Sequence, residues 1–167
     1  ILLAGPWADA DPYQVNPSYP TPVATRLLAG LDDDPRWAEL DAGMRAVVGD
    51  LTGDGSLPPN WAQVDGEGRV EAVRGPDGSD VGFGYDAART LVRYAESCDA
   101  QDHDVVAGTL DALGTADADE TARSVLEAAR AVEAAARVER SARPDRAAGG
   151  DGGRTAWIAA AIAKPAC

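Results

Sequence analysis

The residues most able to perform chemistry lie in the run 84–89, GYDAAR. Asp86 is expected at the start of a helix, where backbone N–H groups and the helix dipole favour an ionised carboxylate. Arg89 follows three residues later, over the same face, and its guanidinium also favours the ionised form. An ionised carboxylate beside an open cleft is what a water-activating general base requires. An aspartate in an i,i+3 ion pair at a helix start is equally common as a structural feature.

Two further clusters hold aromatic side chains in rigid turns. Residues 57–61 (LPPNW) stiffen the backbone with two prolines ahead of Trp61, and a rigidly held tryptophan can stack on the face of a sugar. On general grounds such a tryptophan more often anchors a loop in the core. Residues 16–19 (NPSY) give a turn signal that holds Tyr19 just before a helix, and turn formation with one packed aromatic ring is the plainer interpretation. For both clusters the sequence therefore leaves two roles possible, ligand binding and core packing.

The composition limits the classes of partner. The chain of 167 residues has a net charge of −13 and a pI of about 4.3, so it repels nucleic acids and anionic membrane surfaces. A neutral or cationic substrate remains possible, although such acidity also serves solubility alone. His103 is the only histidine, which excludes a His-rich metal site, and its polar neighbours indicate an ordinary loop residue. Cys98 and Cys167 form no CxxC motif, and the sequence leaves their pairing open.

The pattern of apolar residues predicts an all-α protein. Apolar residues make up 45% of the chain and aromatic residues only 5%, so alanine, leucine and valine must supply most of the packing. Thr21 is expected to cap a helix that begins at Pro22, and Asp34 to cap a second one. The apolar positions of these helices recur at helical spacing: Ala24, Leu27, Leu28 and Leu31 in the first, and Trp37, Leu40, Met44, Val47, Val48 and Leu51 in the second.

Further helices are expected over about 85–97, 103–113 and 119–140. Residues 1–20 are rich in proline and should be extended, and residues 52–84 should form a long irregular loop of the kind that often carries function. A flexible linker is predicted over 142–154, where glycine, arginine and aspartate are dense. It is followed by a short apolar helix within 155–167, which needs a partner surface to bury Trp157 and Ile158.

Taken in order, the three clusters resemble glycoside hydrolase family 8, which contains bacterial endoglucanases, lichenases, chitosanases and some xylanases. Residues 5–8 (GPWA) with 16–19 resemble the stretch that brings a tyrosine to the cleft, residues 57–61 resemble "LxPDW", and residues 83–89 (FGYDAAR) resemble "YGYDAxR". The match covers roughly residues 1–96. The resemblance implies that residues 1–141 form part of an (α/α)6 toroid of stacked helical hairpins.

The same resemblance implies inverting hydrolysis of β-1,4-glycosidic bonds in cellulose, mixed-linkage glucan or chitosan, with no cofactor and no metal. Asp86 matches the general base, Arg89 would orient it, and Tyr19 and Tyr85 would line the subsite at the scissile bond. Trp61 matches the motif's tryptophan. In such a reaction an acid protonates the leaving oxygen, while a carboxylate about 6.5–9.5 Å away deprotonates a water molecule.

Two departures from the family pattern bear on these expectations. The family's acid is a glutamate in a motif resembling "SEGQSYGM", which this sequence lacks, and Asn60 stands where the family commonly has aspartate. The sequence therefore suggests a hydrolase whose N-terminal half is absent, or a subunit of a split enzyme. A glycan-binding relative without catalysis and an unrelated helical interaction domain are the alternatives.

The expected partner is a polysaccharide, with no nucleic acid and no membrane span, and the oligomeric state is not predicted. A polymer substrate implies a secreted or extracytoplasmic protein, although no signal peptide is recognisable in the chain.

Overall fold

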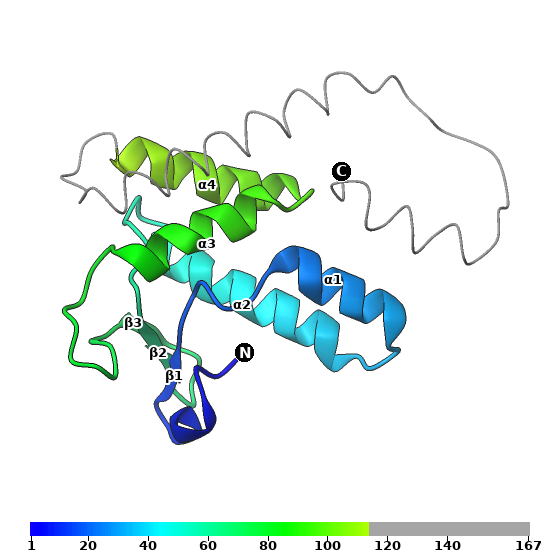
Figure 1. The fold of residues 1–167 in the computed structure, drawn as a ribbon, viewed down its shortest axis with the longest axis horizontal. Helices are drawn as coiled ribbons and strands as arrows, with labels where there is room; N and C mark the ends of the chain where they lie inside the picture. Colours follow the sequence, from blue (N-terminus) through cyan, green and yellow to red (C-terminus); the bar gives the residue numbers. More distant parts are fainter. Residues whose placement is uncertain (114–167) are drawn as a thin grey trace, which may run out of the picture.

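The computed structural model describes residues 1–113. The expected helix at 119–140, the linker at 142–154 and the apolar helix within 155–167 lie outside the described residues. The described part consists of two helical hairpins and a small sheet (Figure 1). Its elements, in chain order, are η1 (Pro6–Ala8), β1 (Tyr13–Val15), α1 (Pro22–Leu31), α2 (Arg36–Thr52), β2 (Ala62–Val64), β3 (Val70–Ala72), α3 (Tyr85–Ala95) and α4 (Ala100–Leu113).

The expected all-α fold, part of an (α/α)6 toroid, is wrong. Residues 13–15, 62–64 and 70–72 form an antiparallel sheet in the order β1-β2-β3, so the described chain mixes helices with a sheet. Two segments predicted to be extended or irregular, 1–20 and 52–84, supply these strands. Each strand has only three residues, which is too short for an alternating apolar pattern to stand out in the sequence.

The helix starts lie close to the predicted caps. The Thr21 hydroxyl accepts a hydrogen bond from the Ala24 N–H at 3.3 Å, and α1 begins at Pro22 as predicted. The second cap differs from the prediction: α2 begins at Arg36 with Pro35, not Asp34, at the N-cap position, although Asp34 Oδ1 accepts from the Arg36 N–H at 2.9 Å. Both predictions rest on side-chain chemistry within one turn of the helix, which the sequence contains in full.

The last hairpin differs from the prediction at its turn. α3 ends at Ala95 rather than Ser97, and α4 begins at Ala100 rather than His103. Asp99 Oδ1 accepts from the Gln101 N–H at 3.0 Å, which supports the earlier start. His103 therefore lies on a helix and not in a loop, with its Nε2 2.6 Å from the Ser97 carbonyl oxygen. Cys98 lies in the turn between the helices, and no cysteine within residues 1–113 is free.

Helix α2 is the centre of the packing. Met44 and Val47 pack against Val15, Ala62 and Val64, so one side of α2 covers the sheet. On its other side Val48 packs against α3 and α4, in a cluster with Tyr94, Ala95 and Val106. The predicted apolar stripe of this helix is therefore buried at its middle, and its apolar residues join the sheet to the second hairpin.

A buried ion cluster joins the two hairpins beside this core. Arg45 on α2 bonds to Asp102 on α4 and, at 2.9 Å, to Asp41 one turn earlier on its own helix. Burial alone would lower the pKa of Arg45, but the hydrogen bonds that it donates to Asp102 and Asp41 outweigh this effect, and the pKa is raised. The pKa of Tyr94 is also raised, first by burial and then by the negative charge of Asp102.

Candidate functional site

The sheet brings two of the sequence clusters together. Val15 pairs with Ala62 across β1 and β2, so Asn16, which follows β1, and Trp61, which precedes β2, come to the same end of the sheet. The Trp61 ring lies 6.1 Å from that of Tyr19 in an edge-to-face arrangement and 6.3 Å from that of Trp7. These separations are typical of aromatic packing. Three aromatic rings from separate segments therefore form one group.

Asn60 connects the run 84–89 to this aromatic group. Its side-chain oxygen accepts a hydrogen bond from the Ala87 N–H at 2.9 Å, and its own N–H donates to the Gly82 carbonyl at 2.9 Å. Gly84 is the N-cap of α3 and offers no side chain for this purpose. A Cβ atom at position 84 would lie 2.6 Å from the Asn60 amide nitrogen, so glycine is required there by the close approach. Asn60 thus caps α3 from 27 residues away.

Replacing Asn60 with alanine is expected to destabilise the fold by about 1–2 kcal/mol, because the first turn of α3 loses its side-chain cap. Urea denaturation followed by circular dichroism measures this change. Asn60→Asp is the matched control: its carboxylate can still accept from Ala87 and is favoured by the helix dipole, so it should keep most of the stability. A loss below about 0.3 kcal/mol in the alanine variant would show that Asn60 is not a significant cap.

Asp86 is held in a closed ring of four side chains. Its Oδ2 accepts from Asn16 Nδ2 at 3.0 Å, and its Oδ1 accepts from Arg89. Arg89 also donates to the Ser18 hydroxyl at 3.2 Å, and Ser18 donates in turn to Asn16 Oδ1 at 2.7 Å. Asn16 and Ser18 are buried, whereas the Asp86 side chain keeps 25% of its exposure. The carboxylate is therefore fixed in orientation and still open to water.

The outer surface of this ring is aromatic and exposed. The Arg89 guanidinium carbon lies 5.3 Å from the centre of the Tyr85 ring, which is a cation–π contact. Tyr85, Tyr19 and Trp7 are 56%, 44% and 54% exposed, whereas Trp61 is only 9% exposed. Trp61 is therefore the buried member of the aromatic group, and the exposed rings are the ones available for a ligand.

All five residues predicted for the site come together: Asp86, Arg89, Tyr85, Tyr19 and Trp61. The tyrosine and tryptophan stand beside each other, and the ring containing Asp86 connects to them through residues 16–18 and through Asn60. Four contributors were not predicted as site residues: Trp7, Asn16, Ser18 and Asn60. Each stands within a short stretch already noted for its motif, but only the sheet register and the capping contact reveal its role.

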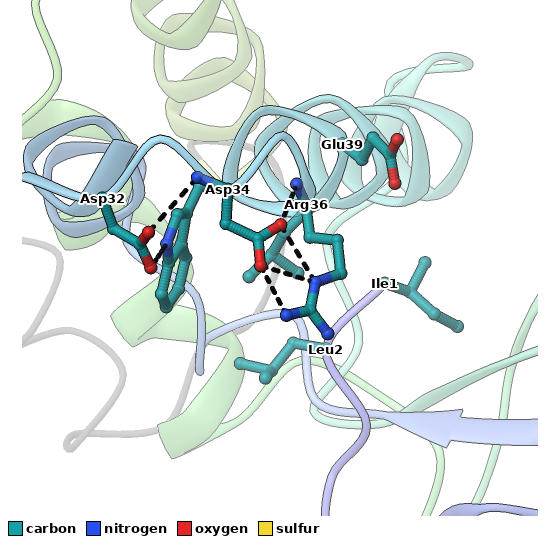
Figure 2. Close-up of a pocket in the computed structure, with 8 residues that line it drawn as sticks. Ile1, Leu2, Asp32, Asp34, Arg36 and Glu39 are labelled. Carbon is teal, nitrogen blue, oxygen red and sulfur yellow. Dashed lines mark hydrogen bonds and ion pairs between the residues drawn. The ribbon is translucent and has the colours of Figure 1, made fainter. Parts of the chain in front are cut away.

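A hollow in the described part of the chain lies elsewhere (Figure 2). It has a volume of about 500 Å³ and is lined by residues 1–2 and by the turn from α1 into α2. Its polar groups bond to one another: Asp34 pairs with Arg36, and Trp37 Nε1 donates to Asp32 Oδ2 at 3.1 Å. The Arg36 side chain lowers the pKa of Asp34 to about 2. None of the five predicted site residues lines this hollow.

Comparison with known proteins adds no assignment: no protein-family model matches the chain, and no curated protein matches its sequence. Within residues 1–113, no group of three or more histidine, cysteine or acidic residues is arranged to hold a metal ion. No helix of the described part has the length and apolar character needed to cross a membrane.

Proposed function

We propose that this chain carries the water-activating half of an inverting glycoside-hydrolase site for β-1,4-linked glycans, with Asp86 as the general base. One observation carries the proposal: a partly exposed carboxylate is oriented by Asn16 and Arg89, and the segment that supplies Asn16 also supplies Tyr19, which packs against Trp61. A base must present a free oxygen lone pair to a water molecule, and in this ring each Asp86 oxygen accepts one of the two hydrogen bonds that it can accept.

The supporting chemistry follows from the arrangement of the ring. Arg89 and Asn16 each donate a hydrogen bond to the Asp86 carboxylate, and the two bonds together fix its orientation. Ser18 bonds to both Asn16 and Arg89, so it positions the two residues that position the base. When the water loses its proton to Asp86, its oxygen attacks the anomeric carbon, the bond to the leaving oxygen breaks, and the leaving oxygen takes a proton from the general acid of the other half of the site.

The exposed rings define the proposed substrate surface. Sugar C–H faces pack on aromatic rings. Trp7, Tyr19 and Tyr85 present exposed rings: Trp7 and Tyr19 lie beside Trp61, and Tyr85 lies against Arg89, which bonds to Asp86. The surface suits a neutral or cationic glycan, because the chain has a net charge of −13. Cellulose, mixed-linkage glucan and chitosan all satisfy this condition.

A second candidate function is glycan binding without hydrolysis. This candidate is favoured because Asp86 is the only carboxyl group in the ring that it forms with Asn16, Ser18 and Arg89. Inverting hydrolysis needs an acid about 6.5–9.5 Å from the base. In the enzyme this acid must come from a residue outside the ring or from another chain.

Glycan binding tests the surface that both candidates share. Trp7→Ala is expected to weaken the binding of a β-1,4-linked hexasaccharide at least tenfold, or about 1.4 kcal/mol, because an exposed aromatic contact is lost. Isothermal titration calorimetry with glucan and chitosan oligosaccharides measures the change. Trp37→Ala, at the distant hollow, is the control and should bind normally. Equal binding by both variants would contradict a substrate surface at Trp7.

A further inference from the structure

An apolar stripe on α1 has no partner among the described residues. Ala24, Leu27, Leu28 and Leu31 recur at the i, i+3, i+4, i+7 spacing of a buried helical face. All four are nevertheless exposed, and the three leucines keep 46%, 39% and 77% of their surface. The opposite side of the helix, with Pro22 and Thr25, is the one packed inward. A contiguous exposed apolar patch of this kind marks a surface that binds something.

The same sequence contains an apolar segment whose side chains need a partner surface to be buried. Residues 155–163 (TAWIAAAIA) carry no charge, and a helix of this length cannot bury Trp157 and Ile158 within itself. About 40 residues separate it from Leu113, a stretch that spans on the order of 100 Å when extended and can reach any face of a small domain. Because the segment belongs to the same chain, its effective concentration at this surface is in the millimolar range. A second copy of the chain at micromolar concentration competes poorly with it.

The cysteines favour the same location. Cys98 lies in the α3–α4 turn and is not free, and the only other cysteine in the sequence is Cys167, four residues after the apolar segment. Asp99, next to Cys98, lies 3.9 Å from Arg45, and Arg45 bonds to Asp41 at 2.9 Å. Asp41 accepts from Thr25 of α1 at 2.7 Å. These contacts run from the turn to α1, which Figure 1 shows beside α2.

We propose that residues 155–163 dock on the α1 stripe and that a Cys98–Cys167 disulfide fastens them there. Forming this bond removes two protons and two electrons from the two thiols. A disulfide-bearing oxidoreductase accepts them by exchange through a mixed disulfide and is itself reduced to a dithiol. The docked segment covers the three exposed leucines with Trp157 and its apolar neighbours. This inference does not depend on the proposed hydrolase function.

Hydrogen exchange on the full chain tests the docking from both sides. In Trp157→Asp, amides of residues 24–31 should exchange at least about tenfold faster, whereas Lys164→Asp, just outside the segment, should leave them unchanged. Conversely, Leu28→Asp should accelerate exchange in residues 155–163, and Ala29→Asp, one position round the helix, should do so far less. Circular dichroism confirms that each variant stays folded.

Three results would overturn the proposal. The first is unchanged exchange in residues 24–31 of folded Trp157→Asp. The second is protection of these residues that rises with protein concentration, which assigns the stripe to a second copy. The third is peptide mapping without reductant that finds both cysteines of the natively produced protein as free thiols.

Discussion

Asp86→Asn is expected to reduce hydrolysis of a β-1,4-linked glycan by the native full-length protein at least about 10²–10⁴-fold, because general-base catalysis contributes a factor of that size. The asparagine amide has nearly the same shape as the carboxylate and can still accept from Asn16, but it cannot take a proton from water. Glycan binding should change little, because the exposed aromatic rings remain. Reducing-sugar release and calorimetric binding, measured on the same preparation, separate the two effects.

Asp80→Asn is the matched control for this variant. Asp80 stands in the same approach to α3, but its side chain is 84% exposed and pairs with Arg74 rather than with the ring. Its replacement should leave hydrolysis within about twofold of the unmodified protein, as expected for a surface substitution away from the site. If Asp86→Asn kept near-normal turnover while folded, Asp86 would not be the base.

Arg45→Met is expected to destabilise the fold by about 3–5 kcal/mol, because it leaves the carboxylate of Asp102 buried without its cation. Asp102 is 2% exposed, so water cannot replace the lost partner without opening the contact between α2 and α4. The free energy of unfolding from urea denaturation measures the effect. A loss below about 1 kcal/mol would show that the cluster contributes little to holding the hairpins together.

Two further variants separate the ion cluster from charge loss in general. Arg36→Met removes a cation whose side chain is 83% exposed, and its effect should stay below about 1 kcal/mol. Combining Arg45→Met with Asp102→Leu removes both the arginine and the buried carboxylate. Since apolar pairs often replace buried ion pairs without loss, the double variant should recover a large part of the stability lost by Arg45→Met alone.

The helices were predictable because their signals are local. Thr21 and Asp34 bond to backbone groups two or three residues away, and the apolar residues of α2 repeat within one element. The sheet was not predictable, because its three strands are short and two of them are separated from β1 by two helices. Gly68, with φ +83°, lies in the β2–β3 turn and is a local sign of a hairpin.

The site follows the same division. Asp86 and Arg89 stand three residues apart on one helix, so their ion pair was expected from spacing alone. Asn16 and Ser18 bond to Asp86 and Arg89, which are about 70 residues away in the sequence. No local sequence pattern predicts such contacts. The three-stranded sheet, absent from the prediction, is what places the NPSY stretch beside Trp61. The error in fold class and the residues missed in the site therefore have one origin.

The most direct test of the account is the anomeric configuration of the first product. Proton NMR of fresh hydrolysate from the native full-length protein and a soluble β-1,4-linked oligosaccharide should show the α-anomer at the new reducing end before mutarotation. Asp86→Asn should release neither anomer. Initial release of the β-anomer would indicate a retaining mechanism, with carboxyl groups about 5–5.5 Å apart, and would contradict Asp86 as the base that activates water for inversion.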